Sequence, residues 1–216
     1  KGQILLKSAD DIQPAWDELG SQELILESYV TFSRELSIIG VRSTDGTTAF
    51  YDLFENTHRN GILRRSISPA DASAHLQPQC EQIAKSIMDH LEYVGVMALE
   101  LFDTAEGIVI NEMAPRVHNS GHGTIEGNET SQFENHIRAI CGSPVGSVLS
   151  LGQHIMINCI GKAPDPSQAL SITGCHLHLY GKEDRIGRKV GHVTFHSRNV
   201  LFMKTRDFIE ARMNVD

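Results

Sequence analysis

The sequence predicts an α+β protein, in which helices flank an antiparallel sheet and a small, mostly β module follows. Three observations support this fold class. Short apolar strands are joined by turn residues, as at Asp45 and Gly46 and at 105–107, a pattern typical of β-hairpins. The segment 70–91 has apolar residues at helical spacing. Beyond residue 148 the pattern changes to short strands between Gly and Pro, so we predict two domains, 1–148 and 149–216.

The expected elements follow in chain order. Ser8 is a good N-cap for a helix over 9–19, which Gly20 would end. Helices are also expected over 70–91, 130–140 and, weakly, 199–212. Strands are expected over 4–6, 23–30, 35–41, 47–51, 61–67, the two arms of a hairpin within 97–112, 155–160, 175–180 and 192–195.

Composition excludes several classes of protein. The chain has 216 residues, of which 40% are hydrophobic, and a formal net charge of −8. That charge argues against a nonspecific nucleic-acid binder. No apolar run approaches the roughly 20 residues that span a bilayer, so we expect a cytoplasmic protein. The four cysteines form no CxxC pair, which indicates neither a zinc site nor a redox motif.

Two carboxylates in the predicted hairpin are the first candidate site. Glu100 and Glu112 each follow an apolar run, and on facing strands they would come within roughly 5 Å of each other. Such carboxylates are costly to bury without a partner, and Mg²⁺ is a natural one. Alternatively, each Glu faces solvent or pairs with Arg. Asn111 and the polar loop that follows favour the metal.

The loop after the hairpin concentrates polar side chains: Arg116, His118, Asn119, Ser120 and His122. Arg116 offers a planar fork for phosphate or carboxylate, and Gly121 and Gly123 would let the backbone approach a ligand closely. These glycines argue against a helical zinc pair of His118 and His122. A surface or hydrogen-bonding role is the alternative for each histidine, but their crowding favours ligand contact.

Two weaker patterns complete the candidates. Glu27 and Glu35 flank a bend at 31–33. Free backbone groups at the strand ends would suit the edge of a purine, and the carboxylates would suit ribose hydroxyls. The alternative is two exposed carboxylates on amphipathic strands. Between glycines of 181–192 lie four cations that predict a phosphate clamp, although a solvated charge run is also typical of such a segment. These are Lys182, Arg185, Arg188 and Lys189.

Five segments together resemble one known family. They are ENTHRNGILR (55–64), YVGVMALELF (93–102), INEMAPRVHNSGH (110–122), TSQFENHIRAI (130–140) and HLHLYGKEDRIGRKVGH (176–192). They are similar to N5-carboxyaminoimidazole ribonucleotide synthetases, which are ATP-grasp ligases of purine biosynthesis. The likeness runs from Lys1 to about Phe195, and APRVHNSGH distinguishes this branch from other ATP-grasp enzymes.

The resemblance implies an ATP-grasp fold and a reaction that uses ATP, bicarbonate and 5-aminoimidazole ribonucleotide, with Mg²⁺, by way of carboxyphosphate. It also implies a possible homodimer. Matched to ATP are Lys1, Gly2, Gln3, Glu27, Ser28, Tyr29, Val30, Glu35, His58, Asn111 and Glu112. Matched to the metal are Glu100 and Glu112, and matched to the aminoimidazole ribonucleotide are Arg116, His118, Asn119, Ser120, Lys182 and Arg188, the first two also as catalytic residues.

The chain departs from this family at its start. It begins at the tail of the phosphate loop, so we expect a truncated protein with little or no synthetase activity by itself. One alternative is a noncatalytic nucleotide-binding module, which loss of Glu100 or Glu112 would favour; both are present. Another is a transition-metal protein, because the chain has 11 histidines. Their scatter counts against it.

Overall fold

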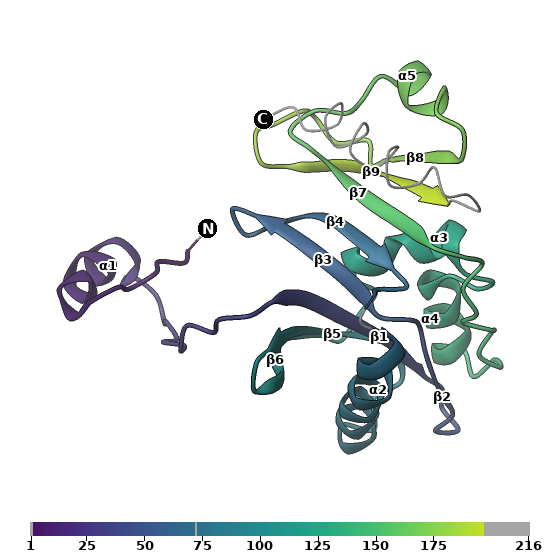
Figure 1. Cartoon of the computed structure of the whole chain (residues 1–216), viewed down its shortest axis with the longest axis horizontal. Helices are drawn as coiled ribbons and strands as arrows, with labels where there is room; N and C mark the ends of the chain where they lie inside the picture. Colours follow the sequence, from purple (N-terminus) through teal and green to yellow (C-terminus); the bar gives the residue numbers. More distant parts are fainter. Residues whose placement is uncertain (1, 72, 197–216) are drawn as a thin grey trace. The chain divides into compact units, whose positions relative to one another are not determined.

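The computed structural model describes residues 2–71 and 73–196 (Figure 1). Lys1 and the predicted helix over 199–212 lie outside the described residues. The chain divides into two compact units, one ending at Thr31 and one beginning at Phe32.

The first unit contains a 3-10 turn, η1 (Ala9–Asp11), followed by helix α1 (Ile12–Leu19). The Asp11 carboxylate accepts the backbone N–H groups of Lys7 and Ser8 at 2.8 and 2.9 Å, and these bonds lower the pKa of Asp11. The Gly20 N–H donates to the Trp16 carbonyl and ends the helix. The predicted helix is therefore confirmed. The strands predicted over 4–6 and 23–30 are wrong, because in the described residues no neighbouring strand pairs with either segment.

The second unit is built on an antiparallel sheet, and every strand pair found in it is antiparallel, as predicted. Its described strands are β1 (Arg34–Arg42), β2 (Thr48–Phe50), β3 (Phe54–Arg59), β4 (Ile62–Ser68), β5 (Gly95–Thr104), β6 (Gly107–Ala114), β7 (His154–Ile160), β8 (Cys175–Leu179) and β9 (Lys189–His196). They lie in the order β6-β5-β1-β3-β4-β7-β9-β8, and β2 pairs with β1. We did not predict β3.

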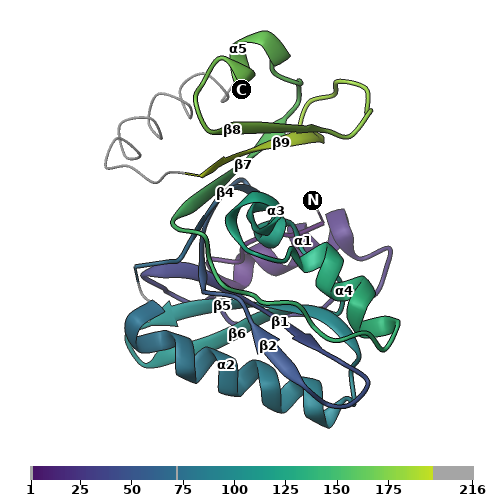
Figure 2. The same ribbon diagram turned by 90° about the vertical axis from the view of Figure 1, so that its right-hand side faces the viewer.

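Helices cover both faces of this sheet (Figure 2). On one face α2 (Ser73–His90) packs Cys80, Ala84 and Met88 against apolar residues of β1 and β5. The other face carries η2 (Asn119–Gly123), α3 (Thr124–Gly127) and α4 (Gln132–Ile140). The short α5 (Pro166–Leu170) lies next to β8. A separate apolar cluster on β7 and β9 includes Ile155 and Val193.

A polar row crosses the sheet on the face that carries η2. Because alternate residues of a strand point to opposite faces, aligned residues of paired strands share a face. Glu112 pairs with Glu100, which pairs with Ser37, and further along Asn56 pairs with Ser66. These positions run from β6 to β4. The fold therefore gathers the predicted metal carboxylates and several buried polar side chains on one face.

The predicted domain boundary at residue 148 stays a prediction. The strand that follows it, β7, pairs with β4 and so continues the same sheet.

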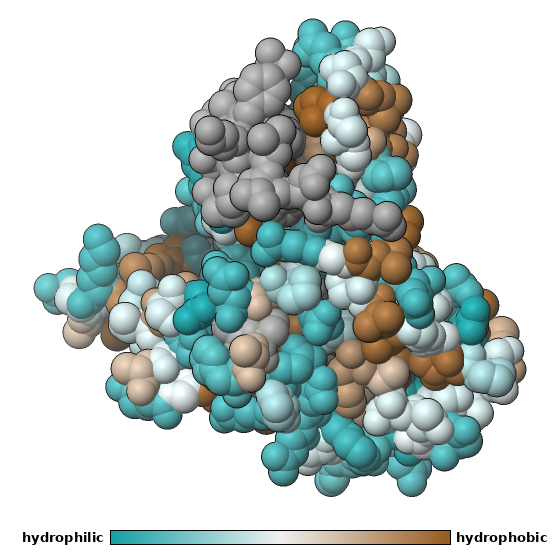
Figure 3. Space-filling view, turned by 45° about the vertical axis from the view of Figure 1, so that its right-hand side comes forward, coloured by the Kyte–Doolittle hydropathy of each residue, from teal (hydrophilic) through white to brown (hydrophobic). Residues whose placement is uncertain are grey.

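Within the described residues, no helix is long and apolar enough to cross a membrane. Hydrophobic residues gather in patches on the face seen in Figure 3. Large exposed apolar side chains include Ile137, Ile140, Leu149 and Leu151.

Candidate active site

The two predicted metal carboxylates are direct partners on neighbouring strands. Glu100 of β5 is aligned with Glu112 of β6, as the hairpin predicted. Glu100 is half-buried and Glu112 is exposed. Burial raises the pKa of Glu100; His58 lowers it, whereas the negative charges of Glu112 and Glu35 raise it further. A group of carboxylates under this mutual repulsion is a suitable place for a cation.

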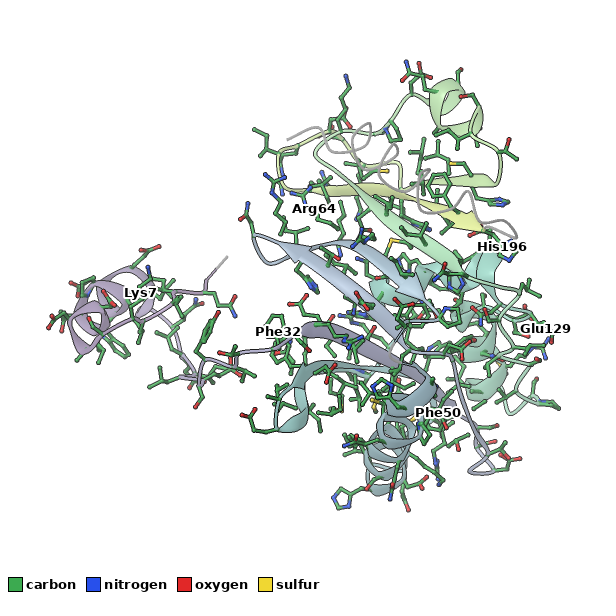
Figure 4. All side chains as sticks on the ribbon, in the orientation of Figure 1. Lys7, Phe32, Phe50, Arg64, Glu129 and His196 are labelled. Atoms are coloured by element: carbon green, nitrogen blue, oxygen red, sulfur yellow. The ribbon has the colours of Figure 1, made fainter. Side chains whose placement is uncertain are left out.

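Three register shifts in the sheet lie beside candidate residues. Leu101 pairs with Ile110 whereas Glu100 pairs with Glu112, so Asn111 is an extra residue in β6. In the same way, Arg64 is an extra residue in β4, next to Leu63, the partner of His58. Val190 is an extra residue in β9, next to Lys189. Arg64 is labelled in Figure 4. Such bulges are common next to active sites, where they redirect side chains.

The predicted nucleotide residues Glu35 and His58 are brought together by β1 and β3. The Glu35 carboxylate lies 2.5 Å from His58 Nδ1. Burial favours the neutral ring, but the hydrogen bond to Glu35 and the charges of Glu35 and Glu100 outweigh it and raise the pKa of His58. Phe32, at the start of the same unit, stacks on Phe102 with ring centroids 4.5 Å apart (Figure 4).

The polar loop is held by a glutamine that the sequence did not indicate. Gln132 is fully buried, accepts the His118 N–H at 3.0 Å and donates to the His118 carbonyl at 2.7 Å. The backbone N–H of Gln132 donates to the Thr124 hydroxyl, and that hydroxyl donates to the Gly121 carbonyl. A polar residue inside a predicted helix carries no signal of such a role. The loop conformation is therefore set by α4.

The glycines of this loop have a packing role. A Cβ at Gly121 would lie 2.2 Å from Ile39 Cδ1, and one at Gly123 would lie 2.6 Å from the His154 ring. We predicted that these glycines let the backbone approach a ligand. In the structure they let the loop approach side chains of the sheet.

His118 lies next to Glu100, one of the two predicted metal carboxylates. Its Nε2 is 3.4 Å from Glu100 Oε1, and its Nδ1 is 2.9 Å from Ser120 Oγ. Burial, with smaller effects of Arg116 and Lys189, lowers the pKa of His118 to about 4. The ring is therefore neutral near pH 7, and its contact with Glu100 is not an ion pair.

The other loop residues differ in what they offer a ligand. Arg116 is exposed, and its Nη1 donates to the Val117 carbonyl. Asn119 Nδ2 is buried and lacks a hydrogen-bond partner among the described residues, so it has a donor to spare. Ser120 is fully buried, which favours a positioning role over direct contact with substrate.

Lys189, which belongs to the predicted phosphate clamp but not to the residues matched to the ribonucleotide, lies close to this loop. Burial lowers the pKa of Lys189, the positive charges of Lys182 and Arg116 lower it further, and Glu100 raises it. Lys189 thus interacts electrostatically with Lys182 of the predicted clamp, with Arg116 and with the predicted metal carboxylate Glu100. The Lys182 ammonium lies 5.2 Å from the centre of the Tyr180 ring. The half-buried Arg188 directly precedes Lys189, and the basic run that predicted the clamp already contained both residues.

The remaining predicted nucleotide residues belong to the first unit, where Gly2, Gln3, Glu27, Ser28 and Tyr29 are exposed and Val30 is half-buried. Among the described residues, no group of three or more His, Cys, Asp or Glu side chains is arranged to hold a metal ion. Two carboxylates still suit Mg²⁺, which is usually bound by one or two carboxylates together with waters and substrate phosphates.

Comparison with known proteins identifies the family. Residues 1–133 match the ATP-grasp domain. The chain belongs to the ATP-grasp family. Residues 154–204 of this ATP-grasp chain match the phosphoribosylaminoimidazole carboxylase C-terminal domain. Together with the relatives that follow, these matches confirm the predicted resemblance and the predicted fold class.

Several relatives of this ATP-grasp chain are N5-carboxyaminoimidazole ribonucleotide synthases. The Pseudomonas aeruginosa N5-carboxyaminoimidazole ribonucleotide synthase is 49% identical over 90% of this chain and 53% of its own length. The synthetase structure from Thermus thermophilus has a TM-score of 0.93 at 47% identity, over 99% of this chain and 60% of that one. The Aspergillus clavatus enzyme, solved with ADP and 5-aminoimidazole ribonucleotide, has a TM-score of 0.86 at 32% identity, over 94% and 57%. The chain spans about half the length of the curated relatives it matches.

Proposed function

We propose that the protein carrying this chain uses ATP to carboxylate 5-aminoimidazole ribonucleotide with bicarbonate, giving N5-carboxyaminoimidazole ribonucleotide. The observation that carries this proposal is the alignment of Glu100 with Glu112 beside the loop that holds Arg116 and His118. A metal–nucleotide site and a site for an anionic second substrate would then share the edge of the sheet formed by β5 and β6. The relatives named for this reaction support the assignment.

On the nucleotide side, Glu100 and Glu112 would hold Mg²⁺, with Asn111 beside them on the bulge. The metal supplies charge neutralisation for the triphosphate. Glu35 would bind the ribose and His58 would contact the nucleotide, in the pair that the structure shows. For the first unit, contacts of residues 27–30 with adenine and of residues 1–3 with phosphates stay predictions from the resemblance.

Phosphoryl transfer depends chiefly on positioning and charge, so a protein nucleophile is not needed. An oxygen of bicarbonate attacks the γ-phosphorus, and the bond to the ADP oxygen breaks, which gives carboxyphosphate and ADP. The amine of the aminoimidazole ribonucleotide then attacks the carboxyl carbon. Phosphate leaves, and the amine loses a proton to give the carbamate.

On the second-substrate side, cations would hold the anionic groups. Arg116 and Lys189 lie close enough to lower the pKa of His118, and Lys182 acts in the same direction on Lys189. We assign Lys182, Arg188 and Lys189 to the ribonucleotide phosphate and Arg116 to the reacting carboxylate or phosphate. The spare donor of Asn119 and the neutral ring of His118 would contact the same substrate.

A homodimer is a further part of the proposal. Exposed apolar side chains on α4 and on 149–151 give a surface that a second copy would cover. Sedimentation equilibrium of the protein before and after Ile137→Glu tests this. A monomer in both cases would contradict it. The cytoplasmic location stays a prediction.

The experiment that tests the reaction follows labelled carbon. The complete protein is incubated with ATP, Mg²⁺, 5-aminoimidazole ribonucleotide and ¹³C-bicarbonate, and the carbamate is detected by ¹³C NMR. We expect one labelled carbamate for each ADP, and ADP release that requires the ribonucleotide. ADP release without labelled carbamate would favour a different acceptor substrate.

A further inference from the structure

A buried chain of hydrogen bonds reaches His118 from the middle of the sheet. It starts at Ser66 in β4 and passes through Asn56 in β3 and Ser37 in β1 to Ser120 in η2. Its distances are 2.7 Å from Ser66 Oγ to Asn56 Oδ1, 3.1 Å from Asn56 Nδ2 to Ser37 Oγ, 2.8 Å from Ser37 Oγ to Ser120 Oγ and 2.9 Å from Ser120 Oγ to His118 Nδ1. All five side chains are buried, with exposed fractions of 9% or less.

One backbone donor sets the direction of every bond in this chain. The Ser120 N–H points at His118 Nδ1, 3.4 Å away, and a backbone N–H can only donate. His118 Nδ1 is therefore an acceptor, so the Ser120 hydroxyl donates to it and must accept from Ser37. Ser37 in turn accepts from the Asn56 amide, whose oxygen accepts from Ser66.

The acceptor role of Nδ1 determines which nitrogen of His118 carries the proton. With Nδ1 occupied as an acceptor, the neutral ring carries its hydrogen on Nε2. That nitrogen lies 3.4 Å from Glu100 Oε1. His118 thus presents a donor to the carboxylate that we assign to the metal, and cannot accept a proton at Nε2 while it remains neutral.

We propose that Ser37, Asn56 and Ser66 are positioning residues that keep the Ser120 hydroxyl donating to His118 Nδ1 and so, together with the Ser120 N–H, hold His118 in the Nε2–H tautomer beside Glu100. This inference rests on the proposed function only for the role of Glu100. A simpler role is to join three strands to the loop by hydrogen bonds. That role requires the bonds to exist but not to have one direction, which separates the two ideas experimentally.

The test reads the tautomer directly in the ¹⁵N-histidine-labelled chain, by long-range ¹H–¹⁵N NMR correlations at neutral pH and without substrates. Asn56→Asp keeps the side-chain shape but replaces the donor with an acceptor, so Ser37 must donate toward position 56. Ser120 then donates to Ser37, and His118 Nδ1 loses its hydroxyl donor. Ser68→Ala is the control. This buried serine is also in β4, but it donates to the Asp52 carbonyl and takes no part in the series of hydrogen bonds that leads to His118.

We expect the pure Nε2–H form of His118 in the unmodified chain and in Ser68→Ala, and a mixture with the Nδ1–H form in Asn56→Asp, where only the 3.4 Å bond from the Ser120 N–H to Nδ1 remains. An Nδ1–H form in the unmodified chain, or an unchanged Nε2–H form in Asn56→Asp, would overturn the proposal. If Asn56→Asp does not fold, Ser37→Ala replaces it, with a mixture of tautomers expected and a pure Nε2–H form contradicting us. Because no substrate is present, a failed carboxylation assay would refute the proposed function and leave this result intact.

Discussion

Glu112 faces Glu100 across the β5–β6 pair because Asn111 is an extra residue in β6. Without the bulge, the register that pairs Leu101 with Ile110 would continue, so Asn111 would pair with Glu100, and Glu112 would pair with Leu99 on the opposite face. The bulge therefore lets one hairpin combine an apolar core side with a carboxylate pair. It also accounts for the extra residue, Asn111, that precedes the second carboxylate.

Lys189→Ala should weaken binding of the aminoimidazole ribonucleotide. The change removes a half-buried cation that acts electrostatically on Arg116, Lys182 and Glu100. A charge-assisted hydrogen bond is worth roughly 1.5–3 kcal/mol, so we expect KM for the ribonucleotide to rise about tenfold or more. Steady-state kinetics of the complete protein measure it, with the exposed Lys162→Ala as the matched control. Equal KM values in the two variants would remove Lys189 from the site.

Buried His154 should make stability depend on pH. Burial lowers its pKa from 6.5 to about 4 in the folded state. The unfolded chain therefore binds a proton below pH 6.5 that the folded chain does not, and stability falls as the pH drops from about 6.5 toward 4. Each unit of pKa difference is worth about 1.4 kcal/mol.

His154→Leu should remove this contribution. Urea unfolding at pH 7 and pH 5 measures the loss of unfolding free energy on acidification, and we expect a smaller loss in His154→Leu than in the unmodified chain. The exposed His90→Gln serves as the control and should keep the full dependence. The same pH dependence in all three proteins would show that His154 is not the group responsible.

Gly121→Ala should destabilise the fold, because the new Cβ would lie 2.2 Å from Ile39 Cδ1. Overpacking of this kind costs roughly 1–3 kcal/mol. Ile39→Val removes that Cδ1 and should restore part of the loss. Ile38→Val removes the same atom from a neighbouring side chain in a different core cluster, so it should not. Thermal unfolding of the two double variants tests the contact, and equal rescue by both would argue against it.

Much of this architecture could be predicted from local pattern. The hairpin within 97–112, the helices over 70–91 and 130–140 and the strands of the last third have strong periodicity or clear turn residues. The segment 54–59 lacks that signal, since its polar residues face a buried row that only the sheet creates. Segment 23–30 had the pattern of a strand but pairs with no strand among the described residues.

The site shows the same limit. Glu100, Glu112 and Arg116 stand out by residue type and by their place in the hairpin and its loop. Ser37, Asn56 and Gln132 do not, because each is an ordinary polar residue whose role depends on partners 10 to 83 positions away. Lys189 was visible within a basic run, but only the sheet shows which cation of the run lies near Glu100.

The most direct test of the central claim is the Mg²⁺-dependent ATP turnover of the complete protein with Glu112→Gln. The change removes the charge and keeps the shape of the side chain, so we expect turnover to fall by orders of magnitude with the circular dichroism spectrum unchanged. Glu106→Gln, at the turn of the same hairpin, should turn over ATP like the unmodified protein. Near-normal turnover in Glu112→Gln would contradict the assignment of the carboxylate pair to the metal.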